Sequence, residues 1–591
     1  MPLAVALGVQ DRYIWGQTPG RNPLSRLRRL TLPTILCAAF WAAGAPASLA
    51  QQGAAGALLA AREAAAHSDF AASLPYLERL HQIDPQNPAT LEALVLGAMS
   101  VGDTATASRH AAALTALDPN NPAAVLVLIA QGFVAQDHAA VLDLAATTAP
   151  VHPLVTGLAR AWAHLGDGRM SDAQSALDDV ARIDGMRAFA VYCRALALAL
   201  VGDVEGAVAL IEDPADNVAA ALNRRGYVAY ALLLGQTERF DDALALIDEV
   251  FAGSLDPALD RMRAAYQARQ ALPFDLIDSP AKGMAEVFAV MASAMQSADN
   301  LGEALIYAQA AVWVNPGLSD AQLMIGRIFE AMGHPEAAAA AYAAIPVDDV
   351  FGMAARMGRA QVLETLGQRE EAIAVLSALA TTSPHSFAAQ SVLGDFLRRD
   401  GQFAAADTAY TRALDLLDST GRPAEWQTLF ARAIARSRLG DWPAAEADFR
   451  AALAIEPNQS SVLNYLGYSL VERGENLDEA LSMIERAVAG DPTSGYILDS
   501  LAWALFRTGR HIEALPHMER AVELAPTDAI LNDHLGDVYW AVGRQREARF
   551  QWRRALSFAP ADDLDEARIR RKLEVGLDVV RAEAGEPPLT P

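Results

Sequence analysis

The chain has 591 residues and a formal net charge of −25, from 47 basic and 72 acidic residues, and only two of the basic residues are lysines. An acidic chain without a basic stripe lacks the clustered cations that phosphate binding requires, which excludes nucleic acid as a partner. The chain is also too long for one compact core, so it forms several domains or an elongated repeat array. Alanine-rich tracts such as 337–341, with little alternation of β-branched residues, predict an all-α protein.

Residues 1–50 are predicted to be a secretory signal. Three arginines precede the apolar stretch 30–45, and the small residues Ser48 and Ala50 stand three and one places before an expected cut at Gln51. The stretch is short for a membrane span. We therefore expect a periplasmic or exported mature chain without a transmembrane span. Membrane association through an uncleaved anchor stays an open alternative.

The two cysteines predict no disulfide. Cys37 lies inside the predicted signal, and the residues before it do not fit lipoprotein processing, so lipidation there is not favoured. Cys193 follows as the only cysteine of the mature chain and stands in an apolar run. A buried structural cysteine is the interpretation that fits this setting, rather than a nucleophile.

Residues 51–270 are predicted to form a degenerate helical repeat array. Pro85 and Pro119 are 34 residues apart, and Gly102 and Ala107 lie between them at turn and packing positions. Later markers drift in spacing. From residue 251 to 281 the phase is lost, which predicts a loop that joins two arrays and a domain boundary near residue 270.

Residues 271–562 carry the period clearly, with a small insertion at 418–423. A proline recurs every 34 residues near the end, preceded by small residues five and twelve places earlier and by a glycine before those. A leucine followed by a small residue lies about 25 places before each proline. Small residues let two helices approach closely, glycine ends the first helix and proline ends the second. The markers are Gly474, Ala480, Ala487 and Pro492, then Gly509, Ala514, Ala521 and Pro526, then Gly543, Ala548, Ala555 and Pro560.

These spacings resemble the tetratricopeptide repeat family. The resemblance implies a right-handed superhelical solenoid of roughly 13–14 helical hairpins, because one hairpin cannot bury its own apolar face. Residues 563–591 are then expected to form a charged capping helix and tail. We expect no enzyme, cofactor or metal site, since phosphate loops and paired metal ligands are missing and His511, His517 and His534 are scattered.

The family resemblance also implies where a partner would bind. In such repeats the first helices line a concave groove, and particular slots around the small-residue leucine face it. An aromatic at this spacing can instead be wedged between hairpins, and the acidic residues argue against a clamp for a carboxyl terminus. The slots hold Asn464, Tyr468, Asp499, Trp503, Phe506, Asp533, Asp537 and Trp540.

Residues 460–560 resemble exported bacterial tetratricopeptide adaptors that serve a carboxyl-terminal processing protease. This resemblance implies a scaffold that binds a protein or peptide, with an envelope protease or its substrates as the expected partner, in envelope proteolysis or assembly. An accessory protein that binds cell-wall glycan or a small ligand is the alternative. Stacking of sugars on aromatic rings would serve it, but convergent amide and guanidinium groups are sparse.

Overall fold

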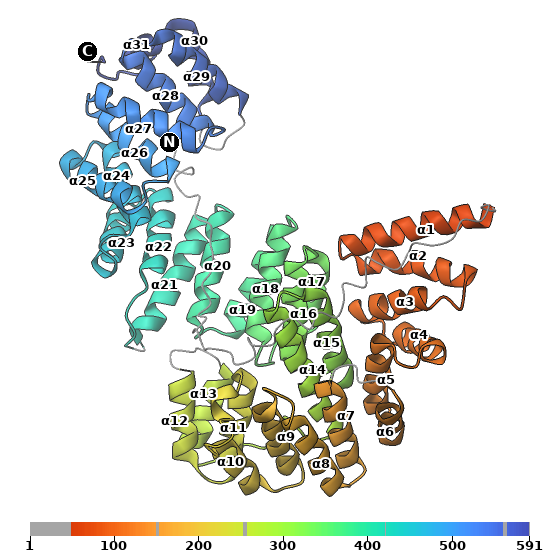
Figure 1. Ribbon diagram of the computed structural model, residues 1–591. Coiled ribbons are helices and arrows are strands. Elements are labelled where there is room, and N and C mark those ends of the chain that lie inside the picture. Colours follow the sequence, from red (N-terminus) through yellow and green to blue (C-terminus); the bar gives the residue numbers. More distant parts are fainter. Residues whose placement is uncertain (1–48, 149–152, 252–256, 420, 559–563, 590–591) are drawn as a thin grey trace. The chain divides into compact units, whose positions relative to one another are not determined.

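The computed structural model describes residues 49–148, 153–251, 257–419, 421–558 and 564–589 (Figure 1). Over these ranges the chain is helical without a strand, which confirms the predicted all-α class. The predicted signal up to residue 48, with Cys37, lies outside the described residues. The described chain forms two compact units, residues 49–379 and 380–589.

The first unit is built from consecutive antiparallel helical pairs, with one short 3-10 helix at Ala219–Ala221. Its helices are α1 Leu49–Ala66, α2 Phe70–Ile83, α3 Pro88–Ser100, α4 Thr104–Leu117, α5 Pro122–Val134, α6 His138–Thr147, α7 Pro153–Gly166, α8 Met170–Ala181, α9 Arg187–Leu200, α10 Val204–Glu212, α11 Arg224–Gln236, α12 Phe240–Val250, α13 Pro257–Gln267, α14 Pro280–Ser297, α15 Leu301–Val314, α16 Ser319–Ala331, α17 Pro335–Ala343, α18 Gly352–Thr365 and α19 Arg369–Thr382.

The second unit continues the same hairpins and ends in two shorter helices. Its helices are α20 Phe387–Arg399, α21 Phe403–Ser419, α22 Trp426–Arg438, α23 Trp442–Ile455, α24 Ser460–Arg473, α25 Leu477–Gly490, α26 Gly495–Arg507, α27 His511–Leu524, α28 Ala529–Ala541, α29 Gln545–Ser557, α30 Glu566–Val575 and α31 Leu577–Glu583. One capping helix is predicted after residue 563, whereas the structure has two there.

The hairpin of α28 and α29 shows why the sequence folds this way. The Asp528 carboxylate caps α28 by accepting from two backbone N–H groups of its first turn. Gly543 turns the chain at φ +83°, a conformation that favours glycine. A Cβ at Gly536 would stand 2.4 Å from the Trp552 ring, so the small residue admits the indole between the helices. In this hairpin a small residue therefore lets the two helices approach closely, as the 34-residue period predicts.

The segment 251–281 is not the simple loop that the lost phase predicts. It contains α13, whose Leu259, Met262 and Tyr266 are buried on one side of the helix. The Tyr266 hydroxyl donates to the Ala231 carbonyl at 3.0 Å, which ties α13 to α11. The helical spacing of these three apolar residues favours a helix despite the flanking prolines, and among the described residues the stretch between Gln267 and Pro280 connects α13 to α14.

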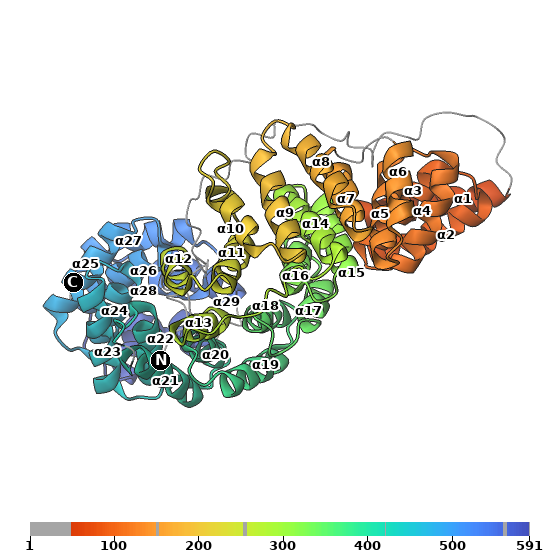
Figure 2. The same cartoon turned by 90° about the horizontal axis from the view of Figure 1, so that it is seen from below.

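In the first unit, α14 packs along the first helices of earlier hairpins. It contacts α5, α7 and α9, and Figure 2 shows α14 beside α7, as Figure 1 does. A Cβ on Gly283 would stand 2.5 Å from the Trp162 ring of α7, so the two helices touch closely. The Arg225 guanidinium pairs with the buried Glu286 carboxylate of α14. The sequence places a domain boundary near residue 270, whereas here helices on both sides of that residue pack in one unit.

Candidate protein-binding site

The eight residues predicted to line a groove lie on α24, α26 and α28, the first helices of three consecutive hairpins. Each of these helices contacts the next one in the series. The structure therefore brings the predicted residues together in one layer of the second unit. We call this layer, α24 with α26 and α28, the inner layer.

The expectation that these side chains form an open surface is wrong for most of them. Trp503 and Asp533 are half-buried. The other six are buried: Asn464, Tyr468, Asp499, Phe506, Asp537 and Trp540. Several of these side chains are buried because other parts of the same unit cover them or bind to them.

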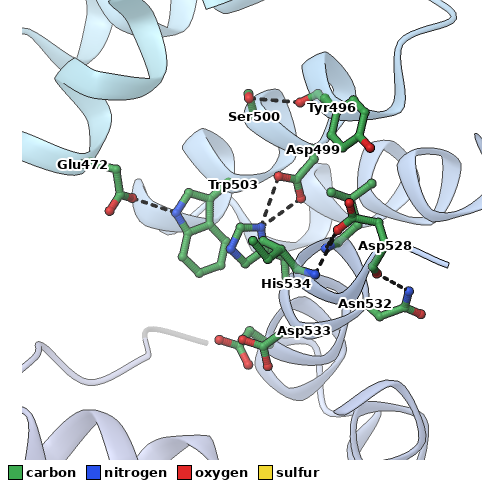
Figure 3. Close-up of polar contacts among 12 residues, drawn as sticks. Glu472, Tyr496, Asp499, Ser500, Trp503, Asp528, Asn532, Asp533 and His534 are labelled. Carbon is green, nitrogen blue, oxygen red and sulfur yellow. Dashed lines mark hydrogen bonds and ion pairs between the residues drawn. The ribbon is translucent and has the colours of Figure 1, made fainter. Parts of the chain in front are cut away.

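Trp503 is held in one orientation from three sides. Its indole Nε1 donates to Glu472 Oε1 at 2.8 Å (Figure 3). Its ring stacks on Phe506 with centroids 4.9 Å apart. On the neighbouring helix, the His534 imidazole lies parallel to the indole, with centroids 3.9 Å apart. Aromatic rings at such separations attract each other beyond their burial alone. Trp503 is thus a rigid, half-buried aromatic.

His534 is itself fixed by a carboxylate. Its Nδ1 lies 2.9 Å from Asp499 Oδ1, and both side chains are buried. Burial opposes a charge on the imidazole, but the Asp499 carboxylate outweighs it, with further help from Asp533 and Asp537, so the pKa of His534 is raised. The buried pair connects α26 to α28 directly behind Trp503.

A buried lysine neutralises the acids of α28. The Lys572 ammonium, on α30, donates to Asp533 at 2.9 and 2.8 Å and to Asp537 at 2.8 Å, and only 1% of Lys572 is exposed. Asp537 also accepts from Trp552 Nε1 at 2.8 Å. Burial and the neighbouring Asp533 raise the pKa of Asp537 to about 6, although Lys572 opposes the shift. These two acids bind the chain's own lysine.

The last helix covers the aromatic end of the inner layer. Asp578 on α31 accepts from Trp540 Nε1 at 2.9 Å, and the Arg581 guanidinium stands 5.9 Å from the centre of the Phe506 ring. Phe506 and Trp540 therefore contact a segment of the same unit in this structure. The sequence signal for this contact was weak, because it depends on residues beyond the last proline of the period.

Asn464 is one of several polar residues of the inner layer, with Ser469 and Asn532, that have a buried atom without a hydrogen-bond partner in the described part of the chain. It is buried on α24, and its Oδ1 has no hydrogen-bond partner in the described part of the chain. A buried amide oxygen without a partner costs free energy unless another group reaches it.

The remaining candidates behave as structural residues. Cys193 is buried, and burial raises the pKa of its thiol, which keeps it from acting as a thiolate. Within the described ranges, no group of histidine, cysteine and acidic side chains is arranged to hold a metal ion. None of the helices described has the length and apolar character needed to cross a membrane.

Comparison with known proteins identifies the repeat. A family model described as tetratricopeptide repeat matches residues 323–387, 359–419, 391–460, 430–495 and 466–529. A TPR repeat-containing protein of Pseudomonas aeruginosa, PA4667, is 33% identical over 92 residues, which is 16% of this chain and 16% of that protein.

Two solved structures match parts of the chain at low sequence identity. One is a tetratricopeptide repeat protein from Parabacteroides merdae, 16% identical, at a TM-score of 0.37 over 44% of this chain and 98% of that one. The other is the Cut9–Hcn1 assembly of the APC/C, 13% identical, at a TM-score of 0.37 over 89% of this chain and 96% of that one. The family model over residues 323–529 shows that this part of the chain contains tetratricopeptide repeats.

Proposed function

We propose that this chain is a scaffold that binds a protein partner on the inner layer of its second unit, centred on Trp503. The observation that carries the proposal is the rigid, half-buried indole, fixed by Glu472, Phe506 and His534. A pre-oriented aromatic loses little side-chain entropy on binding, and such residues supply much of the affinity at protein interfaces. Tetratricopeptide repeats support a role in protein binding in general terms.

The charges around Trp503 are paired within the chain. Glu472 accepts from the Trp503 indole and pairs with Arg507 at 3.1 Å, and Asp533 pairs with Lys572 at 2.8 Å. The proposal therefore rests on the aromatic contact with Trp503 and not on a charge preference of the partner.

The test is a binding measurement with single substitutions. Affinity capture from an envelope extract should recover one protein, and its purified form should bind the intact chain. Trp503→Ala should weaken that binding about tenfold or more. Phe550→Ala is the matched control, because Phe550 is a large aromatic on α29 with 61% of its surface exposed.

Two results would contradict this proposal. If the Trp503→Ala variant binds the partner as well as the intact chain does, the surface is assigned to the wrong place. If the purified chain binds cell-wall glycan fragments and captures no protein, the glycan alternative replaces the scaffold.

We further propose that the partner is an envelope protein, either a protease or one of its substrates. This rests on the signal-like order of residues 26–50 and on the resemblance of residues 460–560 to exported adaptors. Sequencing the mature amino terminus from fractionated cells is the measurement. Cleavage near Gln51 and recovery from the periplasm are expected, whereas an intact chain starting at Met1 in the inner membrane would contradict export.

A further inference from the structure

The chain turns sharply between its last two helices, directly over an aromatic ring. Gly576 joins α30 to α31 at φ +88° and ψ 161°, a conformation that favours glycine. A Cβ at Gly576 would stand 2.4 Å from the Trp540 ring. The turn therefore sets α31 against the inner layer, instead of continuing the stacked hairpins.

α31 contacts the inner layer through two polar side chains. Asp578 accepts from the Trp540 indole at 2.9 Å, and the Arg581 guanidinium lies over Phe506. Leu577 and Val580 are buried, whereas Val579, between them, is 42% exposed. Along α31 the order is therefore a buried leucine, the aspartate, one exposed position, a buried valine and the arginine.

α31 is a short helix that depends on its contacts with the rest of the unit. The helix has seven residues, too few to be stable in water without packing. Its covalent link to α30 is one glycine, and Arg571 of α30 pairs with Glu583 at 2.6 Å. The tail bonds back onto α31, because Arg581 donates to the Pro587 carbonyl at 2.9 Å. Such a segment behaves as a ligand whose high effective concentration comes from its covalent link.

We infer that α26 and α28 form a peptide-binding site for a short amphipathic helix with this pattern, and that α31 is its internal occupant. A partner segment would carry an apolar residue, an adjacent carboxylate, a second apolar residue three places after the first, and then a guanidinium. The carboxylate would bond to Trp540 Nε1 and the guanidinium would cover Phe506. This inference rests on the proposed function and adds a second part to the same layer, next to Trp503.

The test uses a chain that ends at Gly576 and a fluorescent peptide of residues 577–589. Anisotropy should show that the shortened chain binds this peptide at least tenfold more tightly than the full chain, whose site is filled. The Asp578→Asn peptide should bind about tenfold more weakly, since it loses a charge-assisted bond to the indole. The Val579→Ala peptide is the control and should bind as the unchanged peptide does.

A full-length variant covers the case in which the shortened chain does not fold. In the full chain, Asp578→Ala combined with Arg581→Ala weakens the internal occupant only, so this variant should bind the unchanged peptide at least tenfold more tightly than the intact chain. The inference is overturned if neither the shortened chain, shown by circular dichroism to be helical, nor this variant gains peptide binding.

The two proposals fail differently. Peptide binding that requires Phe506 and Trp540, in a chain that captures no protein partner, would support this site and contradict the scaffold proposal. A partner that depends on Trp503 but is neither displaced by the 577–589 peptide nor bound more tightly by the full-length variant would overturn this inference and leave the scaffold proposal standing.

Discussion

The Trp503 indole and the His534 imidazole lie parallel, 3.9 Å apart between ring centroids, on helices of consecutive hairpins. Because His534 is also bonded to Asp499 at 2.9 Å, the stack and the ion pair meet in one residue. The orientation of Trp503, and with it the proposed binding surface, depends on a histidine that was predicted only as one of several scattered histidines.

His534→Ala should loosen the inner layer and weaken partner binding together. The change removes one face of the Trp503 stack and leaves the buried Asp499 without this partner, at a cost of about 1–3 kcal/mol. Hydrogen exchange of the amides of α26 and α28 measures that loss locally, which suits a chain of two units.

The control for this change is His517→Ala on α27, where the histidine is half-buried and outside the stack. We expect this change to alter the free energy of local opening, measured by hydrogen exchange, by less than about 0.5 kcal/mol. Equal effects of the two alanines would contradict a special role for His534.

Lys572→Met should destabilise α28 and α30 strongly. Lys572 is buried against Asp533 and Asp537, and removing it leaves carboxylates without the cation that compensates them. Breaking a buried ion pair on one side costs about 3–5 kcal/mol. Hydrogen exchange of α28 measures the effect, and combining the change with Asp533→Asn and Asp537→Asn should recover part of it.

The chain's other lysine gives a matched control. Lys282 pairs with Asp278 near the start of α14, with part of its side chain in solvent. An exposed pair contributes about 0–1 kcal/mol, so Lys282→Met should change exchange little. If Lys572→Met lowers stability no more than Lys282→Met does, the buried network of Lys572, Asp533 and Asp537 does not stabilise the unit.

The acids of α28 predict a pH dependence of known sign. The pKa of Asp537 is about 6 in the folded chain, above the usual 3.8, so the folded state binds this proton more tightly than the unfolded state does. Stability from this group is then present below pH 4 and falls as the pH rises from about 4 to 6. A raised pKa for His534 acts in the same direction at higher pH, since its contribution is lost as the pH rises through the folded pKa.

Asp537→Asn removes the lower part of this dependence. The variant should be less stable than the intact chain at pH 4, because the amide cannot accept from both Lys572 and Trp552. Between pH 4 and 6, however, its stability should fall less steeply. Hydrogen exchange of the α28 amides at three pH values, corrected for the intrinsic exchange rate, measures this stability. If stability falls as steeply with pH in the variant as in the intact chain, Asp537 is not the group that titrates.

The period in the sequence was enough to predict the hairpins but not what covers them. Pro492 and Pro526 each stand two residues past the end of a helix, and Ala480 and Ala514 are buried between helices, as their spacing predicts. These features depend on neighbours within about 34 residues. The exposure of Trp540 depends instead on Asp578 and Gly576, which lie beyond the last repeat and follow no period.

Some of the missed contacts had a signal in the composition. Lys572 is one of two lysines in a chain whose other basic residues are arginines, and it follows two aspartates that the groove pattern singled out. A compact ammonium fits between two carboxylates where a planar guanidinium would need more space. The packing of α14 along α7 had no such signal, because Gly283 and Trp162 are 121 positions apart and belong to no shared repeat position.

Gly283→Ala tests that packing in the first unit. A Cβ at this position would stand 2.5 Å from the Trp162 ring, so α14 must shift or the indole must turn, at a cost of about 1–3 kcal/mol. Faster hydrogen exchange is expected in α7 and α14 together, because each helix covers the other. Exchange in α28 and α29 of the second unit should not change.

Gly302→Ala is the matched control on the next helix. A Cβ there meets nothing within 4 Å, and alanine restricts the unfolded chain more than glycine does, so we expect stability to be unchanged or to rise by about 0.4–1 kcal/mol. If Gly283→Ala behaved as Gly302→Ala does, α14 would not be packed on α7. That result would contradict the close contact of Gly283 with Trp162 on which the prediction rests.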